Sequence, residues 1–224
     1  MPAQTLAPVV PAAEIHSGVG LKRVHSSSFT ARWTMGVTTN FGTFKGWVRH
    51  QLANISYVFG RYEEQTRLPS RVDRLVFVCL GNINRSAFGA EVARGIGLHA
   101  VSIGLSTTTG APATPLAIAQ AQCQGFCLTE HRATNLSDYV YQEGDLLIAM
   151  EARHVERLAA HGMPRSAIIL LGAWARPWRL HLHDPHTLSP AYFATCFTLI
   201  ESAVRELGRS LDGNARGDSK EAWP

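Results

Sequence analysis

The sequence predicts an α/β protein in which a doubly wound sheet of four parallel strands follows a helical N-terminal extension. Four short apolar runs alternate with helical patterns, which is typical of a parallel sheet covered by helices on both faces. The predicted strands are residues 75–79, 100–105, 145–150 and 167–171. The predicted helices are residues 85–95, 115–124, 151–161 and 190–207. Thr114 followed by Pro115 is typical of a helix start.

The N-terminal third of the chain differs from this pattern. Residues 1–36 are rich in Pro, Ala and Ser, so we expect an unstructured tail there. A transit-like peptide and a translation start at Met35 are alternatives for the same segment. Residues 37–73 form the predicted extension and linker, residues 74–211 the α/β domain, and residues 212–224 a disordered tail.

Within the extension, residues 41–62 have the pattern of an amphipathic helix. Apolar side chains recur at steps of three and four residues, and Lys45, Arg49, Gln51 and Asn54 lie on the opposite side. The apolar face can pack on the α/β domain, lie on a membrane surface or dock a partner protein. The sequence leaves these alternatives open.

Composition excludes several classes of function. The apolar fraction of 46% and the net charge of +4 fit a soluble globular protein. The net positive charge comes from the first 60 residues, where Glu14 is the sole acid, so it does not indicate nucleic-acid binding. We expect neither a transmembrane helix nor a secretory signal, because the chain lacks both apolar patterns. The four cysteines match neither a zinc motif nor a disulfide framework, which favours a reducing, cytoplasmic location.

The segment LVFVCLGNINRS, residues 75–86, is the candidate functional site. An apolar strand ends at Cys79, a polar loop follows, and a helix begins near Arg85. Backbone N–H groups of such a loop and the helix dipole favour an anion beyond the strand end, where ligands bind if this strand is central. The same field favours the thiolate form of Cys79, and the guanidinium of Arg85 suits two phosphate oxygens. These residues predict phosphoryl transfer through a phosphocysteine.

The same segment resembles the active-site loop of the low-molecular-weight protein tyrosine phosphatases. It has the C-x5-R-S motif, and further matches follow in the family's order at residues 102–105, 128–136, 145–151 and Asp184-Pro185. The resemblance implies a flavodoxin-like fold of the phosphotyrosine phosphatase I type. It also implies hydrolysis of phosphotyrosine or another aryl phosphate ester without a metal or other cofactor. A bacterial member would act on a phosphotyrosine protein, with a tyrosine kinase of polysaccharide assembly as one candidate.

The resemblance also implies a function for each motif residue. Cys79 would attack phosphorus, and Asp184 would protonate the leaving oxygen and later deprotonate water. Ser86 would hydrogen-bond the thiolate, and Asn82 would fix the loop conformation. The phosphate would be held by the loop and the start of its helix, which comprise Leu80, Gly81, Asn82, Ile83, Asn84, Arg85 and Ser86.

Departures from the family pattern lie inside and around this loop. Asn84 stands where the family often has a second cysteine, so we expect Cys79 to lack a protective disulfide and to overoxidise readily. Residues 106–109 and His186-Thr187 lack the aromatic residues that often wall the family's cleft. The acid after the third strand is Glu151 rather than Asp.

Two other functions are alternatives. One is a catalytically weakened phosphate-binding or docking module. The other is an arsenate reductase-like enzyme that uses Cys123 and Cys127 as a redox relay, although we expect both to pack in the core.

The histidines invite a separate comparison. The three histidines of residues 181–186, HLHDPH, suggest a metal site. They do not match the metal-binding motif H-x-H-x-D-H, because the Asp falls one place too early. We expect His131 and Arg132 to be structural residues that satisfy loop carbonyls.

Overall fold

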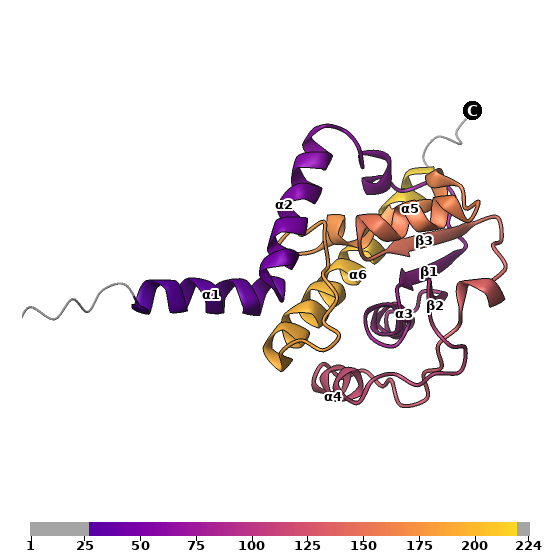
Figure 1. Ribbon diagram of the computed structural model, residues 1–224. Helices are drawn as coiled ribbons and strands as arrows, with labels where there is room; N and C mark the ends of the chain where they lie inside the picture. Colours follow the sequence, from indigo (N-terminus) through magenta and orange to yellow (C-terminus); the bar gives the residue numbers. More distant parts are fainter. Residues whose placement is uncertain (1–26, 219–224) are drawn as a thin grey trace, which may run out of the picture.

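The computed structural model describes residues 27–218 and shows a single four-stranded parallel sheet (Figure 1). The strands are β1 (Arg74–Cys79), β2 (Ala100–Gly104), β3 (Asp145–Ala149) and β4 (Ile168–Leu170). Their order is β2-β1-β3-β4, so the chain leaves β1 in one direction to β2 and later returns to its other side with β3. The predicted sheet is therefore confirmed. Cys79 ends the central strand at the topological switch point, where doubly wound folds bind ligands.

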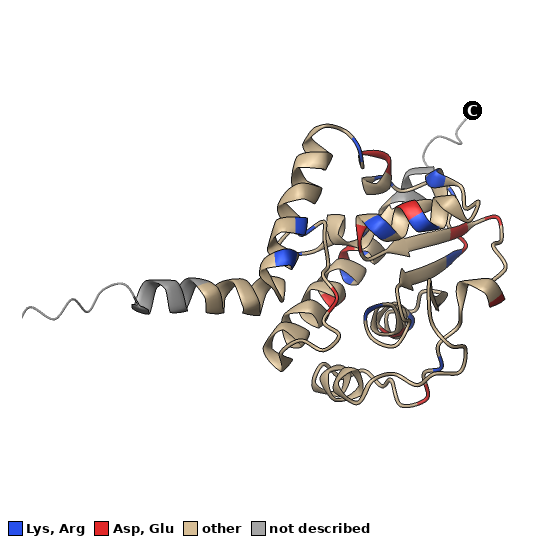
Figure 2. Ribbon diagram, viewed as in Figure 1, with Lys and Arg blue, Asp and Glu red and all other residues tan. Residues whose placement is uncertain are grey.

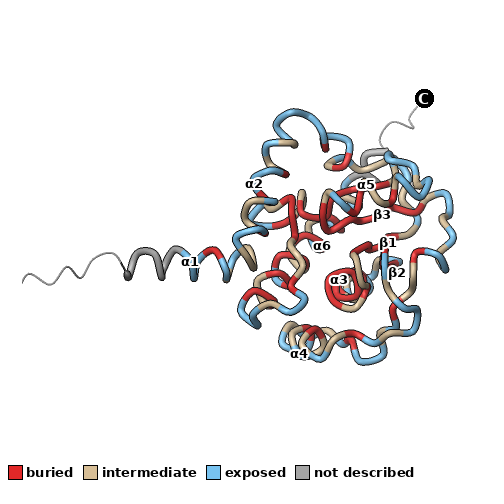
Figure 3. Tube along the Cα trace, viewed as in Figure 1, coloured by how far each residue is buried: buried red, intermediate tan, exposed pale blue. Residues whose placement is uncertain are grey.

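Four helices cover the sheet: α3 (Arg85–Gly95), α4 (Pro115–Cys123), α5 (Ala152–Ala160) and α6 (Pro190–Asp218). Alternate residues of β1 point to opposite faces. Leu75 and Phe77 pack against the layer that contains α3, α4 and α6, whereas Val76 and Val78 pack against the layer that contains α5. The buried residues in Figure 3 follow the sheet and the inner sides of these helices.

Helix α3 approaches β1 closely because Gly89 has no side chain. A Cβ atom at Gly89 would lie 2.7 Å from the Phe77 ring. Phe88, on the same helix, stacks on Phe197 of α6 with the ring centroids 4.1 Å apart. Full burial of one such aromatic side chain contributes about 1.5–3 kcal/mol, and here it fixes the start of α3 beside the end of β1.

Helix α6 is longer than predicted. It continues to Asp218 and so includes part of the segment 212–224 that the sequence placed in a disordered tail. Leu211 still packs on the core, and the ion pair between Arg209 and Glu206, at 2.9 Å, links successive turns. The remainder of that predicted tail lies outside the described residues.

The extension begins with two helices, α1 (Ser27–Phe41) and α2 (Phe44–Val58), and a short 3-10 helix follows at Glu64–Thr66. Helix α1 occupies residues 27–36, which the sequence placed in an unstructured tail; residues 1–26 lie outside the described part of the chain. Residues 27–35 contain neither Pro nor Gly, which permits the helix. Gly42, with a φ of +77°, turns the chain between the two helices, and Thr43 caps α2.

Helix α2 packs on the domain through its small and polar side chains. Gly46 and Ala53 are buried, whereas the apolar Phe44, Leu52 and Ile55 are exposed. Packing of the predicted apolar face on the domain is therefore wrong for these positions. Small side chains let the helix backbone come close to its neighbours, which larger apolar ones would prevent. No helix in the described part of the chain is long and apolar enough to cross a membrane.

Candidate active site

The loop after β1 surrounds the sulfur of Cys79 with hydrogen-bond donors. Cys79 is buried, with its Sγ 3.0 Å from Ser86 Oγ and 3.2 Å from the backbone nitrogen of Asn82. Asn82 has a φ of +51°, a left-handed conformation that Asn tolerates better than most residues. This turn aims its N–H at the sulfur. Both groups can therefore donate to a thiolate and stabilise it.

The side chain of Asn82 holds this turn in place. Its Nδ2 donates to Ser86 Oγ at 2.9 Å and to Ser102 Oγ at 2.8 Å, and its Oδ1 accepts from the Thr134 N–H at 2.8 Å. His131 Nε2 lies 2.6 Å from the Asn82 carbonyl oxygen. The structural function expected for His131 is confirmed by this contact. The sequence did not single out Ser102 or Thr134, because they come from separate loops and strands.

Asn84, where the family often has a cysteine, is a structural link in this loop. It is buried, and its Oδ1 accepts a hydrogen bond of 2.6 Å from Thr114 Oγ1. The Thr114 hydroxyl in turn accepts from the Ala117 N–H and caps α4. The position that could carry a second thiol therefore connects the loop to α4.

Arg85, the first residue of α3, joins the loop to two carboxylates. Its Nη1 lies 2.5 Å from Glu151 Oε1 and donates to the Leu182 carbonyl at 2.8 Å, and its Nη2 lies 2.8 Å from Asp184 Oδ2. Burial would lower the pKa of Arg85, but the charges of Asp184 and Glu151 outweigh it and raise the pKa above its ordinary value. Cys79 and Arg85, from one short segment, thus meet Asp184 from a distant loop at one end of the sheet.

A sequence model of the family described as low molecular weight phosphotyrosine protein phosphatase matches residues 74–216, more than half of the chain. The chain belongs to this family. It is a protein tyrosine phosphatase, a phosphoric monoester hydrolase that uses cysteine-based catalysis. The extension, residues 27–73 of the described part, precedes the region that the family model matches.

Bacterial phosphatases resemble this region in sequence and structure. The low molecular weight protein-tyrosine-phosphatase Wzb of Escherichia coli (strain K12) is 31% identical over 143 residues, which cover 62% of this chain and 96% of Wzb. The structure of Wzb from Escherichia coli K30 in complex with sulphate gives a TM-score of 0.54 at 27% identity, over 62% of this chain and 99% of that one. The tyrosine phosphatase AmsI of Erwinia amylovora gives a TM-score of 0.55 at 25% identity, over 62% and 93% of the two chains.

The phosphatase also buries a carboxylate whose partner the sequence did not reveal. Glu151 is fully buried behind Arg85, and its second oxygen lies 2.8 Å from Arg153 Nε. Burial would raise the pKa of Glu151, but Arg85 outweighs this and lowers the pKa well below its usual range. The available signal was an acid directly after a buried strand.

Two imidazoles flank the same carboxylate. His154 Nε2 and His181 Nε2 lie 3.9 and 3.7 Å from Glu151 oxygens. Burial lowers the pKa of His154 to about 3 and that of His181 to about 4, so both rings are neutral near pH 7. In the part of the chain that the structure describes, no group of three or more His, Cys, Asp or Glu residues could hold a metal ion.

The other cysteines differ from expectation. All four cysteines are free, and Cys123 and Cys127 are exposed, so their predicted packing in the core is wrong. Helix α4 turns Ala117 and Ala121 to the core, which places Cys123 on its outer side. Arg132 is structural as expected, because its Nη1 donates to loop carbonyls.

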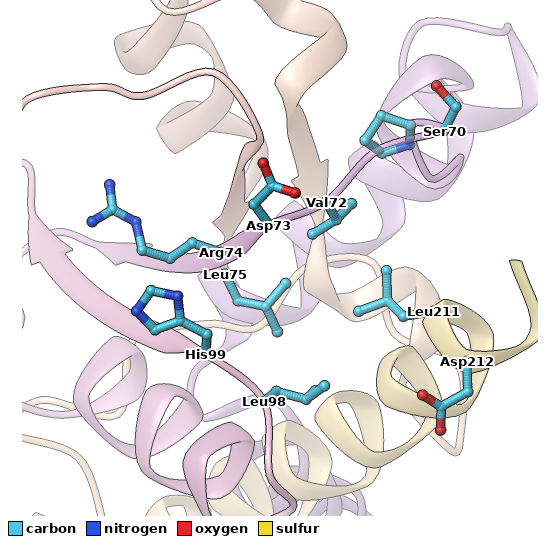
Figure 4. Close-up of a pocket in the computed structure, with 10 residues that line it drawn as sticks. Ser70, Val72, Asp73, Arg74, Leu75, Leu98, His99, Leu211 and Asp212 are labelled. Atoms are coloured by element: carbon cyan, nitrogen blue, oxygen red, sulfur yellow. The ribbon is translucent and has the colours of Figure 1, made fainter. Parts of the chain in front are cut away.

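Two cavities lie beside the sheet, one near Glu151 and one at the end of β1 that is opposite to Cys79. One, of about 320 Å³, lies between α2 and the start of α5, with Arg49 and Leu52 on one side and Glu151 and His181 on the other. Another, of about 250 Å³, lies at the amino end of β1, between Arg74, His99 and the Leu211 turn of α6 (Figure 4). The second is at the end of the sheet opposite to Cys79, so it is not the substrate site.

Proposed function

We propose that this phosphatase hydrolyses phosphotyrosine in proteins through a phosphocysteine on Cys79. The thiolate attacks phosphorus, the S–P bond forms as the bond from phosphorus to the tyrosine oxygen breaks, and Asp184 gives that oxygen its proton. Water then attacks phosphorus while Asp184 accepts its proton. The S–P bond breaks, and inorganic phosphate and the Cys79 thiolate are released. Neither step requires a metal or another cofactor.

The observation that carries this proposal is that Arg85, ion-paired with Asp184 at 2.8 Å, is followed in α3 by Ser86, whose hydroxyl contacts the sulfur of Cys79. Arg85 and the backbone amides from Leu80 to Arg85 would hold the equatorial oxygens, where charge develops in the transition state. Ser86 would stabilise the thiolate when it leaves phosphorus. The sulphate complex of the related Wzb supports a tetrahedral anion as the ligand of this fold.

The substrate protein and the compartment are part of the same proposal. The relatives reported above are bacterial tyrosine phosphatases, which supports a bacterial phosphotyrosine protein as substrate, with a tyrosine kinase of polysaccharide assembly as the first candidate. The free thiol of Cys79 supports action in a reducing cytoplasm.

Hydrolysis of para-nitrophenyl phosphate tests the reaction. The wild type should turn over this substrate, vanadate should inhibit it, and Cys79→Ser should abolish it. Cys123→Ser, which changes an exposed cysteine, should keep wild-type activity. A wild type without turnover would support the alternative of a phosphate-binding module. If the wild type is active, a pull-down with Cys79→Ser should identify the phosphoprotein that this variant traps.

A further inference from the structure

The segment that carries Asp184 is irregular and receives support from two sides. Residues 179–185 form neither helix nor strand. From the α/β domain, Tyr192 Oη donates to the His183 carbonyl at 3.1 Å and Arg85 donates to the Leu182 carbonyl at 2.8 Å. These bonds hold the backbone. The side chain of His183, next to Asp184 in sequence, is contacted by the extension.

The first turn of α2 forms the surface against which the His183 ring packs. Thr43 Oγ1 lies 3.3 Å from His183 Nε2. A Cβ atom at Gly46 would lie 2.8 Å from the ring carbon Cδ2 of His183, so only glycine permits this contact. The Thr43 hydroxyl also accepts from the Gly46 N–H at 2.9 Å and so caps α2. One hydroxyl thus links the helix start to the neighbour of Asp184.

A second set of contacts lies before and after Asp184 in the chain. Arg179 Nη1 donates to the Asn40 carbonyl oxygen, and its guanidinium lies 4.3 Å from the centre of the Phe41 ring. Beyond Asp184, a Cβ atom at Gly42 would lie 2.7 Å from Leu188 Cδ1. Residues 40–46 therefore touch the segment before, beside and after Asp184.

We propose that the junction between α1 and α2, residues 40–46, positions Asp184 for proton transfer. The inference rests on the proposed acid function of Asp184. The junction lies outside residues 74–216, so it is an addition to the family domain rather than a part of it. A misplacement of about 1 Å by a change away from the chemistry can cost about a hundredfold in rate, so contacts to His183 are sufficient to matter.

The test compares two leaving groups in the full-length protein. Phenyl phosphate needs a proton on its leaving oxygen, whereas 2,4-dinitrophenyl phosphate leaves readily without one. Thr43→Val should lower kcat/KM for phenyl phosphate by about tenfold and change it by less than about twofold for the dinitrophenyl ester. Thr43→Ser should restore the rate, because it keeps the hydroxyl. Asp184→Asn should give the largest selective loss.

Further variants keep the test decisive. Arg179→Gln removes the other contact with the junction and should show the same selective loss, so it serves as the test if Thr43→Val does not fold. Ile55→Ala, on the exposed side of α2, should match the wild type for both esters. Equal losses for the two esters, or no loss in either junction variant, would overturn the positioning function. Absence of turnover in the wild type would instead overturn the proposed reaction.

The opposite side of α2 carries an independent observation. Phe44, Leu52, Ile55 and Phe59 are 58%, 56%, 53% and 83% exposed and form one apolar stripe at helical spacing. Figure 3 shows that most residues of α2 are exposed or intermediate, and Figure 2 shows where its Lys and Arg lie. Residues 27–62 contain four Lys or Arg and no Asp or Glu. Two copies that packed through this stripe would bring two helices of the same positive charge together, which disfavours self-association.

We infer that this stripe lies on an anionic membrane surface, which offers both an apolar layer and negative charge. The full-length protein should float with vesicles of phosphatidylcholine mixed with phosphatidylglycerol, less with phosphatidylcholine alone, and less at high salt. The double variant Leu52→Glu, Ile55→Glu should lose most binding. Val140→Glu, at an exposed apolar position elsewhere, should keep it. No preference for anionic vesicles, or a dimer that the double variant disrupts, would overturn the inference.

Discussion

The loop around Cys79 and the segment around Asp184 are held in different ways. The first is buried, and every polar atom of the Asn82 side chain is bonded within the α/β domain. The second leaves the Asp184 side chain 26% exposed, bonded to Arg85 and to the His186 N–H at 3.2 Å. The phosphate cradle is thus rigid within the family domain, whereas the position of the acid also depends on the extension.

The largest effect should come from Arg85→Lys. Lysine cannot reach two oxygens with a planar fork, and it leaves the buried Glu151 with a poorer partner. We expect kcat/KM to fall by about a thousandfold for both good and poor leaving groups.

The matched control is Arg153→Lys, which alters another partner of Glu151 on a half-exposed side chain. It should cost less than about tenfold. Comparable losses in the two variants would mean that Arg85 acts through Glu151 rather than on the phosphate.

Asn82→Ala should lower activity for both leaving groups alike. The change removes an amide that holds Ser86, Ser102 and Thr134, and it leaves buried donors or acceptors without partners. We expect a loss of about 2–4 kcal/mol in the free energy of unfolding and about 10- to 100-fold in kcat/KM. Urea unfolding and the two esters measure these effects. A loss confined to the poor leaving group would contradict the distinction between cradle and acid.

Oxidation should expose the absence of a second loop thiol. After brief peroxide treatment, dithiothreitol should restore only a minor part of the wild-type activity, because Cys79 has no nearby thiol in its loop to form a disulfide. Asn84→Cys should recover several-fold better, although the loss of the Thr114 bond will lower its stability. Full recovery of the wild type would show that Cys79 is protected by another route.

A smaller effect is expected for stability against pH. His181, on the acid segment, faces Glu151, Arg85 and His183, and burial lowers its pKa from 6.5 to about 4. The imidazole binds a proton more readily in the unfolded chain than in the folded one. Its contribution to the free energy of unfolding is therefore complete above pH 6.5 and is lost as pH falls towards 4. The slope is about 1.4 kcal/mol per pH unit.

Urea unfolding between these pH values should give a shallower slope for His181→Gln than for the wild type. His161→Gln, at an exposed position, serves as the control and should keep the wild-type slope. Identical slopes for His181→Gln and the wild type would show that His181 does not titrate with folding.

Sequence patterns predicted the chemistry better than the packing. The spacing of Cys79 and Arg85 after an apolar strand lies within one short segment, so local physics suffices to predict the cradle. Glu151 was visible only as an acid after a strand, because its pairing with Arg85 depends on β1 and β3 being neighbours. For α2, periodicity defined two faces but not which one is buried. That choice depends on Gly46 meeting His183, about 140 residues away in sequence.

Passage of the phosphoryl group through sulfur can be measured directly. The wild type is mixed with a phosphotyrosine peptide, quenched within the first turnover in alkaline denaturant, and mapped by peptide mass. We predict a phosphoryl group on the peptide that contains Cys79, and none on the corresponding peptide of Cys79→Ala. Release of inorganic phosphate with no phosphorylated Cys79 at any time point would contradict the proposed reaction.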